Sequence, residues 1–169
     1  MNTLDYKKQF VENLKETGEY WLGFQNEGKE RVLNGTLFSI CTLIDGVSGL
    51  NDFHSLYFID GLAAEELNYG VELHDMLNTT GENVLVDDLK AIRDYWKASP
   101  DLSIKEALDG MVAQFCLYFA GESELNSHTV LEVVEFLDED NFVEWDCRDL
   151  HEIYTELQDI TKLNKGDLN

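Results

Sequence analysis

Histidines are the first residues in this chain that could do chemistry, because imidazole can bind a metal ion or transfer a proton near neutral pH. The four are His54, His74, His128 and His151. Their spacing gives neither HxH nor HExxH, and no two cysteines form a CxxC pair, so the sequence contains no metal-binding motif. We therefore predict no catalytic residue, no cofactor and no bound metal, and interpret the histidines as surface or boundary residues.

One enzymatic alternative remains open, a small metal-dependent hydrolase in which His54 or His74 acts together with nearby carboxylates. The helix end and loop over residues 45–60 would form its pocket. A structure that places the two histidines far apart and exposed would argue against this alternative. The carboxylates that lie close to them in the sequence are Asp45, Asp52 and Asp75.

Two further segments resemble site motifs without meeting their requirements. Ser48 lies between glycines, but a nucleophile elbow requires the spacing Gly-x-Ser-x-Gly. The acidic run that starts at Asp138 has Val143 where an EF-hand loop requires glycine. We therefore predict a turn at the first segment and an acidic connection between two helices at the second.

Charge is the property that separates this chain from an average globular protein. Thirty-four Asp and Glu stand against twelve Lys and Arg, which gives a net charge of −22. Nucleic-acid affinity depends on basic side chains that displace counterions from phosphates, and anionic membranes likewise attract basic segments. The composition therefore argues against direct binding to nucleic acid or membrane and favours a basic protein surface as partner. A purely solubilising role for the acidity stays open.

The acidic residues are also unevenly distributed along the chain. No Lys or Arg occurs between Arg31 and Lys90 or between Lys105 and Arg148. Carboxylates alternate with apolar and aromatic residues over 132–146, as a binding site for a basic protein surface requires. The partner-binding residues that we predict there are Glu132, Glu135, Asp138, Glu139, Asp140, Glu144, Trp145 and Asp146.

In size, acidity and expected helix content, the chain resembles the acidic DNA-mimic proteins of phages and mobile elements, and the immunity proteins that neutralise nuclease toxins. The resemblance implies a non-enzymatic, stoichiometric inhibitor that engages the basic surface of a nucleic-acid-handling protein. It rests on no shared motif, so no residue role is transferred from these groups. A regulatory or scaffold module is the remaining alternative, and the 3 Trp, 7 Tyr and 9 Phe leave a homodimer open.

Length and composition predict one acidic helical domain over residues 1–169, since 44% hydrophobic residues can form a core. Pro100 is the only proline, so helix breakers are scarce. We predict an all-α or mainly α bundle of six to seven helices, with one short β element near residues 53–59. The first helix is expected to start at Thr3 as its N-cap, and six more are expected to cover about 29–45, 62–77, 84–97, 103–119, 127–137 and 147–163.

Local signals support several of these elements and the expected location. Ser103 and Glu106 have the capping-box spacing of a helix start. Gly35 lies inside an apolar helical pattern, which predicts close packing of a neighbour against it. The longest apolar run, residues 37–44, is too short to cross a bilayer, and the N-terminus lacks a signal-peptide pattern. Together with the lack of a disulfide pattern, this predicts a cytoplasmic protein with buried thiols at Cys41 and Cys116.

Overall fold

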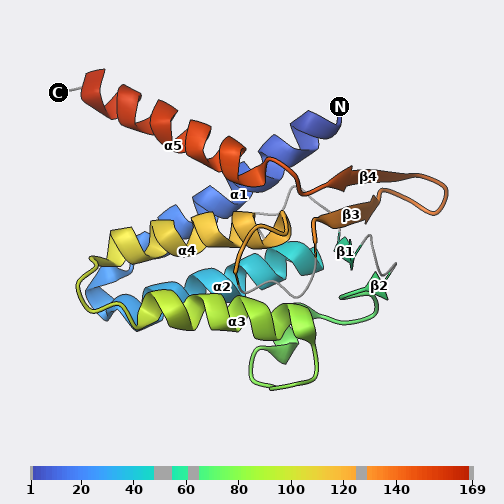
Figure 1. Cartoon of the computed structure of the whole chain (residues 1–169), viewed down its shortest axis with the longest axis horizontal. Helices are drawn as coiled ribbons and strands as arrows, with labels where there is room; N and C mark the ends of the chain where they lie inside the picture. The colour runs from blue at the N-terminus through green and yellow to red at the C-terminus, as the bar shows by residue number, and fades with distance from the viewer. Residues whose placement is uncertain (1, 48–54, 61–64, 125–128, 168–169) are drawn as a thin grey trace.

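The computed structural model describes residues 2–47, 55–60, 65–124 and 129–167, with side chains up to residue 160 (Figure 1). Five α-helices and four β-strands occur among these residues, together with two short 3₁₀ helices, η1 and η2. None of the described helices is long and apolar enough to cross a membrane. The elements are α1 (Thr3–Leu22), η1 (Gln25–Glu27), α2 (Lys29–Asp45), β1 (Leu56–Asp60), β2 (Glu65–Glu66), η2 (Leu73–Met76), α3 (Val84–Lys97), α4 (Ile104–Phe119), β3 (Leu131–Phe136), β4 (Phe142–Asp146) and α5 (Leu150–Asp167).

Helices with strong local signals form where the sequence predicts them. The bounds of α2 agree with the predicted range, and Gly46 ends the helix in the left-handed conformation with φ 78°. Both hydrogen bonds of the capping box join Ser103 and Glu106 at the start of α4. At α1 the capping residue is Asn2, not Thr3, because the Asn2 side chain accepts the backbone N–H of Asp5.

The prediction of an all-α or mainly α bundle of six to seven helices is wrong, because the chain also forms a four-stranded antiparallel sheet. The segment 62–77, expected as a helix, contains β2 and η2 in its described part. The expected helix over 127–137 is instead β3, whose valines favour an extended backbone. The β element predicted near 53–59 lies at β1, but as an inner strand of a sheet.

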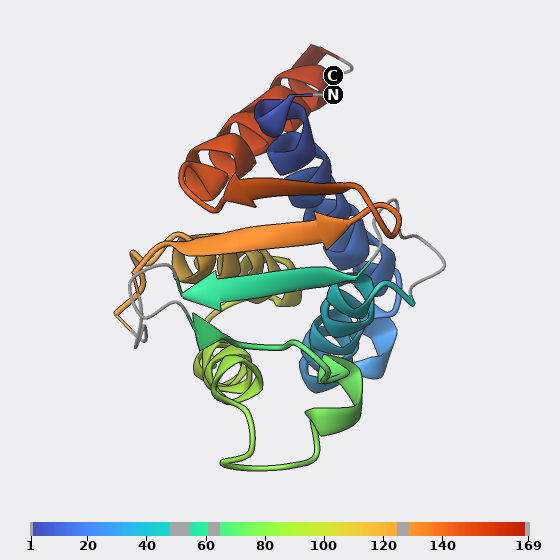
Figure 2. The same ribbon diagram turned by 90° about the vertical axis from the view of Figure 1, so that its right-hand side faces the viewer.

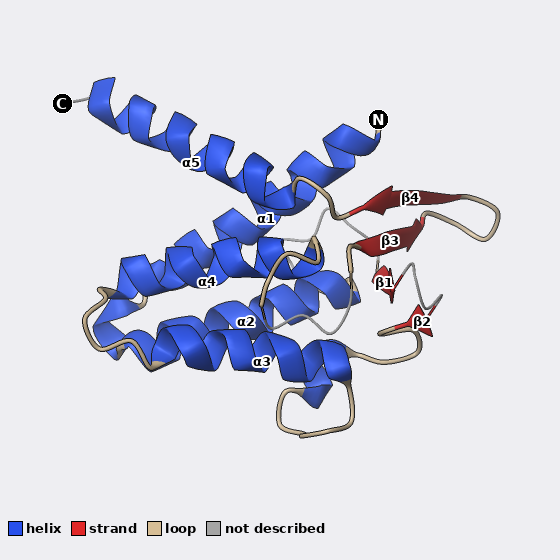
Figure 3. Ribbon diagram, in the orientation of Figure 1, coloured by secondary structure: helices blue, strands red, loops and turns tan. Residues whose placement is uncertain are grey.

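Strand order in the sheet is β2-β1-β3-β4, with each neighbouring pair antiparallel. Val133 of β3 lies opposite Phe58 of β1 on one side and Trp145 of β4 on the other. Helices and strands are separated in space, with the sheet at one end of the molecule (Figure 3). Figure 2 shows the sheet in front of the helices, so one of its faces packs on them.

Aromatic side chains join this inner face to the helices. The ring of Phe58 stacks on Phe119 of α4, with centroids 4.9 Å apart. Phe10 of α1 lies 5.5 Å from the ring of Trp145. All four residues are buried, so the sheet and the helices share one hydrophobic core.

Two glycines permit close contact between helices and tryptophan rings. A Cβ atom on Gly35 would lie 2.4 Å from the Trp21 ring, and one on Gly110 would lie 2.3 Å from the Trp96 ring. Both distances are far below van der Waals contact. The close packing predicted at Gly35 is therefore confirmed, and Trp21 is the neighbour.

Candidate functional site

The sheet face that points away from the helices is the first candidate site. Because side chains alternate along a strand, the residues that alternate with the inward-facing Phe58, Val133 and Trp145 lie on this open face, and of these Val134 is buried. We call it the acidic sheet face (Figure 2). It consists of Tyr57, Ile59, Glu66, Glu132, Val134, Phe136, Phe142, Glu144 and Asp146.

Strand pairing brings carboxylates from three strands together on the acidic sheet face. Ile59 lies between Glu66 of β2 and Glu132 of β3, and Glu132 lies directly opposite Asp146 of β4. Glu144 is one pleat further along β4 and is exposed. Like charges directly opposite one another destabilise a sheet, so this arrangement has an energetic cost.

Exposed aromatic rings occupy the other end of the same face. Phe136 and Phe142 lie opposite each other with ring centroids 6.0 Å apart, and their exposed fractions are 48% and 55%. Tyr57 lies 5.8 Å from Phe136 and 5.3 Å from the exposed Tyr69. A hollow of about 190 Å³ lies further along the face, lined by Glu132 and other sheet residues. Apolar anchors bordered by charge are typical of protein-binding surfaces.

The structure separates the predicted partner-binding residues into exposed and buried ones. Glu132 and Glu144 are exposed on the acidic sheet face, and Glu139 and Asp140 are exposed in the turn between β3 and β4. The segment around them is therefore a hairpin turn, not the predicted connection between two helices. The buried members are Glu135 and Trp145, which point to the inner face with exposed fractions of 2% and 4%.

Asp138 shapes this hairpin turn. Its Oδ1 accepts the backbone N–H groups of Asp140 and Asn141, each at 2.9 Å, and both of its oxygens accept the Asn141 side-chain amide. The hydrogen bond from the Asn141 side chain, assisted by that from the Asp140 backbone, holds the pKa of Asp138 below its ordinary value. The Asp138 carboxylate is therefore already engaged in hydrogen bonds within the turn.

Asp146 is paired within the fold. Lys7 of α1 donates to Asp146 Oδ1 at 3.0 Å and also to the Arg148 carbonyl oxygen at 3.2 Å. Burial raises the pKa of Asp146, but the Lys7 hydrogen bond and the Arg148 N–H outweigh burial and hold the pKa below its ordinary value. This pairing anchors β4 to α1 and reduces the negative field at that edge.

Replacing Lys7 by methionine is expected to lower the free energy of unfolding by about 0.5 kcal/mol at about pH 7, because Asp146 is 42% exposed and its ion pair is screened. A lowered carboxyl pKa stabilises the fold above the unfolded-state value and loses this effect as pH falls through the folded-state value. The difference between wild type and Lys7→Met should therefore shrink as pH falls below the ordinary aspartate value, and it should vanish once pH is below the lowered folded-state pKa of Asp146. Urea unfolding across this range measures it.

The exposed Lys8 on the same helix provides the matched control for this prediction. Lys8→Met makes the same change in net charge without touching Asp146. A stability difference between the two variants that persists at low pH would contradict the assigned role of the pair.

The second candidate site is a group of polar residues around His74, one of the two histidines of the hydrolase alternative. Asp45, at the end of α2, is buried and accepts the backbone N–H groups of Leu73 at 2.8 Å and His74 at 2.9 Å. His74 Nδ1 lies 2.6 Å from Asp45 Oδ2, and this hydrogen bond raises the pKa of His74, opposed by desolvation. Asp75 Oδ1 lies 3.4 Å from His74 Nε2.

The structure thus brings together three residues of the enzymatic alternative, His74, Asp45 and Asp75. The other two, His54 and Asp52, lie outside the described residues. Glu72 joins the group with Oε2 3.6 Å from His74 Nε2, and sequence reasoning missed it. The spacing Glu72-x-His74-Asp75 was the available signal, but it has this geometry only because η2 turns there.

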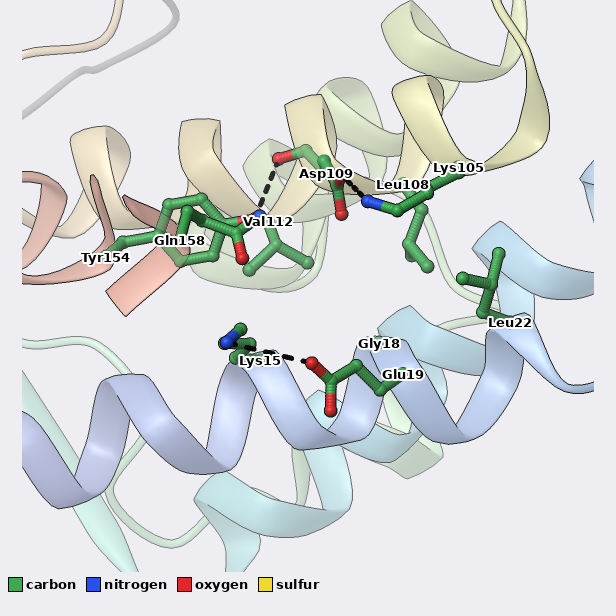
Figure 4. A pocket seen from close by; sticks show the side chains of 10 residues that line it. All are labelled: Lys15, Gly18, Glu19, Leu22, Lys105, Leu108, Asp109, Val112, Tyr154 and Gln158. Atoms are coloured by element: carbon green, nitrogen blue, oxygen red, sulfur yellow. Dashed lines mark hydrogen bonds and ion pairs between the residues drawn. The ribbon is translucent and has the colours of Figure 1, made fainter. Parts of the chain in front are cut away.

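A groove between α1, α4 and α5 has a volume of about 300 Å³ (Figure 4). Its charged residues are paired along their own helices, with Lys15 3.8 Å from Glu19 and Lys105 2.6 Å from Asp109. On the far wall the Tyr154 hydroxyl accepts the Gln158 amide at 2.9 Å. Because its polar groups bind one another, we assign the groove no role beyond helix packing.

The three cysteines offer no nucleophile. Cys41, Cys116 and Cys147 are free thiols, and all three are buried. Burial raises the pKa of each, to about 12 for Cys116, so the thiols stay protonated at neutral pH. The predicted burial of Cys41 and Cys116 is confirmed.

Two arrangements therefore remain from which a function can be argued, the acidic sheet face and the group of residues around His74. The sequence carries no motif of a known enzyme class at either place. No protein-family model, no curated protein and no solved structure matches the chain.

Proposed function

We propose that the protein is a non-enzymatic, acidic binding protein. Its acidic sheet face docks on the basic surface of a nucleic-acid-handling protein and inhibits it stoichiometrically. One observation carries the proposal, namely that the exposed rings of Phe136 and Phe142 share an open face with the exposed carboxylates of Glu132 and Glu144. Such a partner would meet this protein in the cytoplasm.

Charge complementarity determines the kind of partner. A surface that binds nucleic acid presents Lys and Arg donors spaced for phosphates, and the same donors form charge-assisted hydrogen bonds with carboxylates. Within the described residues, no basic nitrogen lies within 4.0 Å of the Glu132 or Glu144 carboxylates. Their field is therefore available to steer a basic protein, while the aromatic rings supply area that is desolvated on contact.

The cost of the charge arrangement supports the same proposal. Glu132 and Asp146 lie directly opposite each other on the neighbouring strands β3 and β4. Of the two, only Asp146 has a lysine partner. A sheet selected for stability alone would place opposite charges at such a pair. A basic partner that docks here would remove the repulsion, so binding recovers free energy that the isolated fold lacks.

The test uses fluorescence anisotropy to measure binding to three basic proteins. Two of them handle nucleic acid, a histone-like DNA-bending protein and pancreatic ribonuclease. The third, lysozyme, is basic but handles no nucleic acid and serves as the control. We expect one or both nucleic-acid-handling probes to bind more tightly than lysozyme. Affinity should fall at least about tenfold between about 50 and about 500 mM salt. Bound duplex DNA should be displaced from the DNA-bending protein if that probe binds.

The matched variants locate the interaction on the sheet. The double substitution Glu132→Gln/Glu144→Gln should weaken binding about tenfold or more. Its control is Glu152→Gln/Glu156→Gln, which makes the same charge change at exposed positions of α5 and should weaken binding far less. Equal loss in both double variants, affinity independent of salt, or binding no tighter than to lysozyme would refute the proposal.

A further inference from the structure

Three potential metal ligands converge at η2, on a part of the molecule distinct from the acidic sheet face. One ligand atom from each of Glu72, His74 and Asp75 lies within 4.8 Å of the other two. His74 Nε2 lies 3.4 Å from Asp75 Oδ1 and 3.6 Å from Glu72 Oε2. All three side chains are therefore directed toward one point.

The separations fit a shared ion better than direct hydrogen bonds. A nitrogen and an oxygen bound to the same tetrahedral zinc ion, each at about 2.0–2.2 Å, lie roughly 3.3–3.5 Å apart. Hydrogen bonds between nitrogen and oxygen are shorter, typically about 2.7–3.2 Å. The distance from His74 Nε2 to Asp75 Oδ1, 3.4 Å, falls in the first range, and the distance to Glu72 Oε2, 3.6 Å, lies just above it; both exceed the second range.

The orientation of His74 is fixed independently of these carboxylates. Asp45 Oδ2 lies 2.6 Å from His74 Nδ1, and the Asp45 side chain is only 2% exposed. The backbone N–H groups of Leu73 and His74 hold that carboxylate in place, and Phe38 packs edge-on against the imidazole at 5.9 Å. A neutral imidazole that donates Nδ1–H to Asp45 presents its Nε2 lone pair to Glu72 and Asp75, as in carboxylate–histidine–metal arrangements.

We infer that Glu72, His74 and Asp75 bind a divalent transition-metal ion, best matched by Zn²⁺, while Asp45 orients His74 from behind. The mixed imidazole and carboxylate set favours zinc over magnesium or calcium, which prefer oxygen ligands alone. Three protein ligands leave a coordination position for water or a small anion. Glu72 and Asp45 also line a neighbouring cavity of about 250 Å³.

Isothermal titration of the full chain with ZnCl₂ tests the inference. We expect about one tight ion per chain and at least about tenfold weaker binding in the variant Glu72→Gln/Asp75→Asn. This variant changes two exposed side chains, 59% and 70% accessible, and leaves the Asp45–His74 contact intact, so it should fold. A second variant, His74→Gln, should show the same loss, and MgCl₂ should not compete.

Two controls separate this site from unspecific attraction of cations to an acidic protein. The variant Glu152→Gln/Glu156→Gln makes the same charge change as Glu72→Gln/Asp75→Asn and should bind Zn²⁺ like wild type. Co²⁺ in place of Zn²⁺ should give a visible spectrum of tetrahedral type without a thiolate charge-transfer band. Equal binding in all variants, full competition by Mg²⁺, or a thiolate band would overturn the inference.

Discussion

Replacing Phe58 by alanine is expected to lower the free energy of unfolding by about 3–5 kcal/mol. The ring is fully buried, stacks on Phe119 at 4.9 Å and lies 6.4 Å from Phe10, so truncation leaves a cavity between the sheet, α1 and α4. Rigid neighbours on both sides cannot collapse into that space. Urea unfolding followed by circular dichroism measures the loss.

The adjacent Tyr57 provides the control, because it lies on the opposite face of the same strand. Its ring contacts Tyr69 and Phe136 but remains partly exposed, so Tyr57→Ala should cost only about 1 kcal/mol. This contrast depends on the alternation of side chains along β1. A larger loss of stability for Tyr57→Ala than for Phe58→Ala would show that the two residues have been assigned to the wrong faces of the sheet.

Removing the buried carboxylate of Asp45 should produce the second large loss, about 3 kcal/mol for Asp45→Ala. Asp45 accepts the N–H groups of Leu73 and His74 and contacts the His74 ring, so its loss leaves buried donors without an acceptor. It would also release η2 from the end of α2. Thermal and urea unfolding of the variant, compared with wild type, test this prediction.

Two further substitutions make the result specific to the hydrogen bonds. Asp45→Asn keeps one acceptor oxygen and the side-chain volume, so its free energy of unfolding should lie between those of wild type and Asp45→Ala. Asp75→Ala removes an exposed carboxylate nearby and should change stability by less than about 0.5 kcal/mol. If Asp45→Ala were no less stable than Asp75→Ala, the contribution of Asp45 to the fold would be rejected.

The parts of the fold that the sequence predicted depend on local interactions. The helices α2, α3 and α4 have caps and apolar periodicity within a few residues of one another, as Gly46 and Ser103 illustrate. Gly35 likewise predicted a close neighbour, because a glycine inside a helix is otherwise unfavourable. Each of these features can be read without knowledge of distant segments.

The sheet escaped prediction because its pairing joins distant segments. Leu131, Val134 and Leu137 have helical spacing, while Leu131, Val133 and Glu135 have strand spacing, and the sequence alone does not decide between them. The hairpin also lacks a glycine, since the Asp138 side chain makes the hydrogen bonds of the turn. Residues 131–136 form a strand because they pair with β1 on one side and with β4 on the other.

Because strand pairing could not be predicted from the sequence, only some of the site residues were predicted correctly. The concentration of acids over residues 132–146 indicated the right segment, but only strand alternation separates the exposed Glu132 and Glu144 from the buried Glu135 and Trp145. Glu72 was missed because its approach to His74 depends on the turn of η2. Tyr57 was not predicted as a site residue because the sequence does not show which strands pair with β1.

The central pair of strands also has a consequence for how the molecule assembles. β1 precedes α3 and α4 in the chain and β3 follows them, so Asp60 meets Leu131 across a loop of roughly 70 residues. Closing so large a loop is entropically costly until the intervening helices have docked. A chain emerging from the ribosome therefore has no acidic sheet face until β3 and β4 have been synthesised. Until then β1 can pair only with β2, and its other edge has no partner strand.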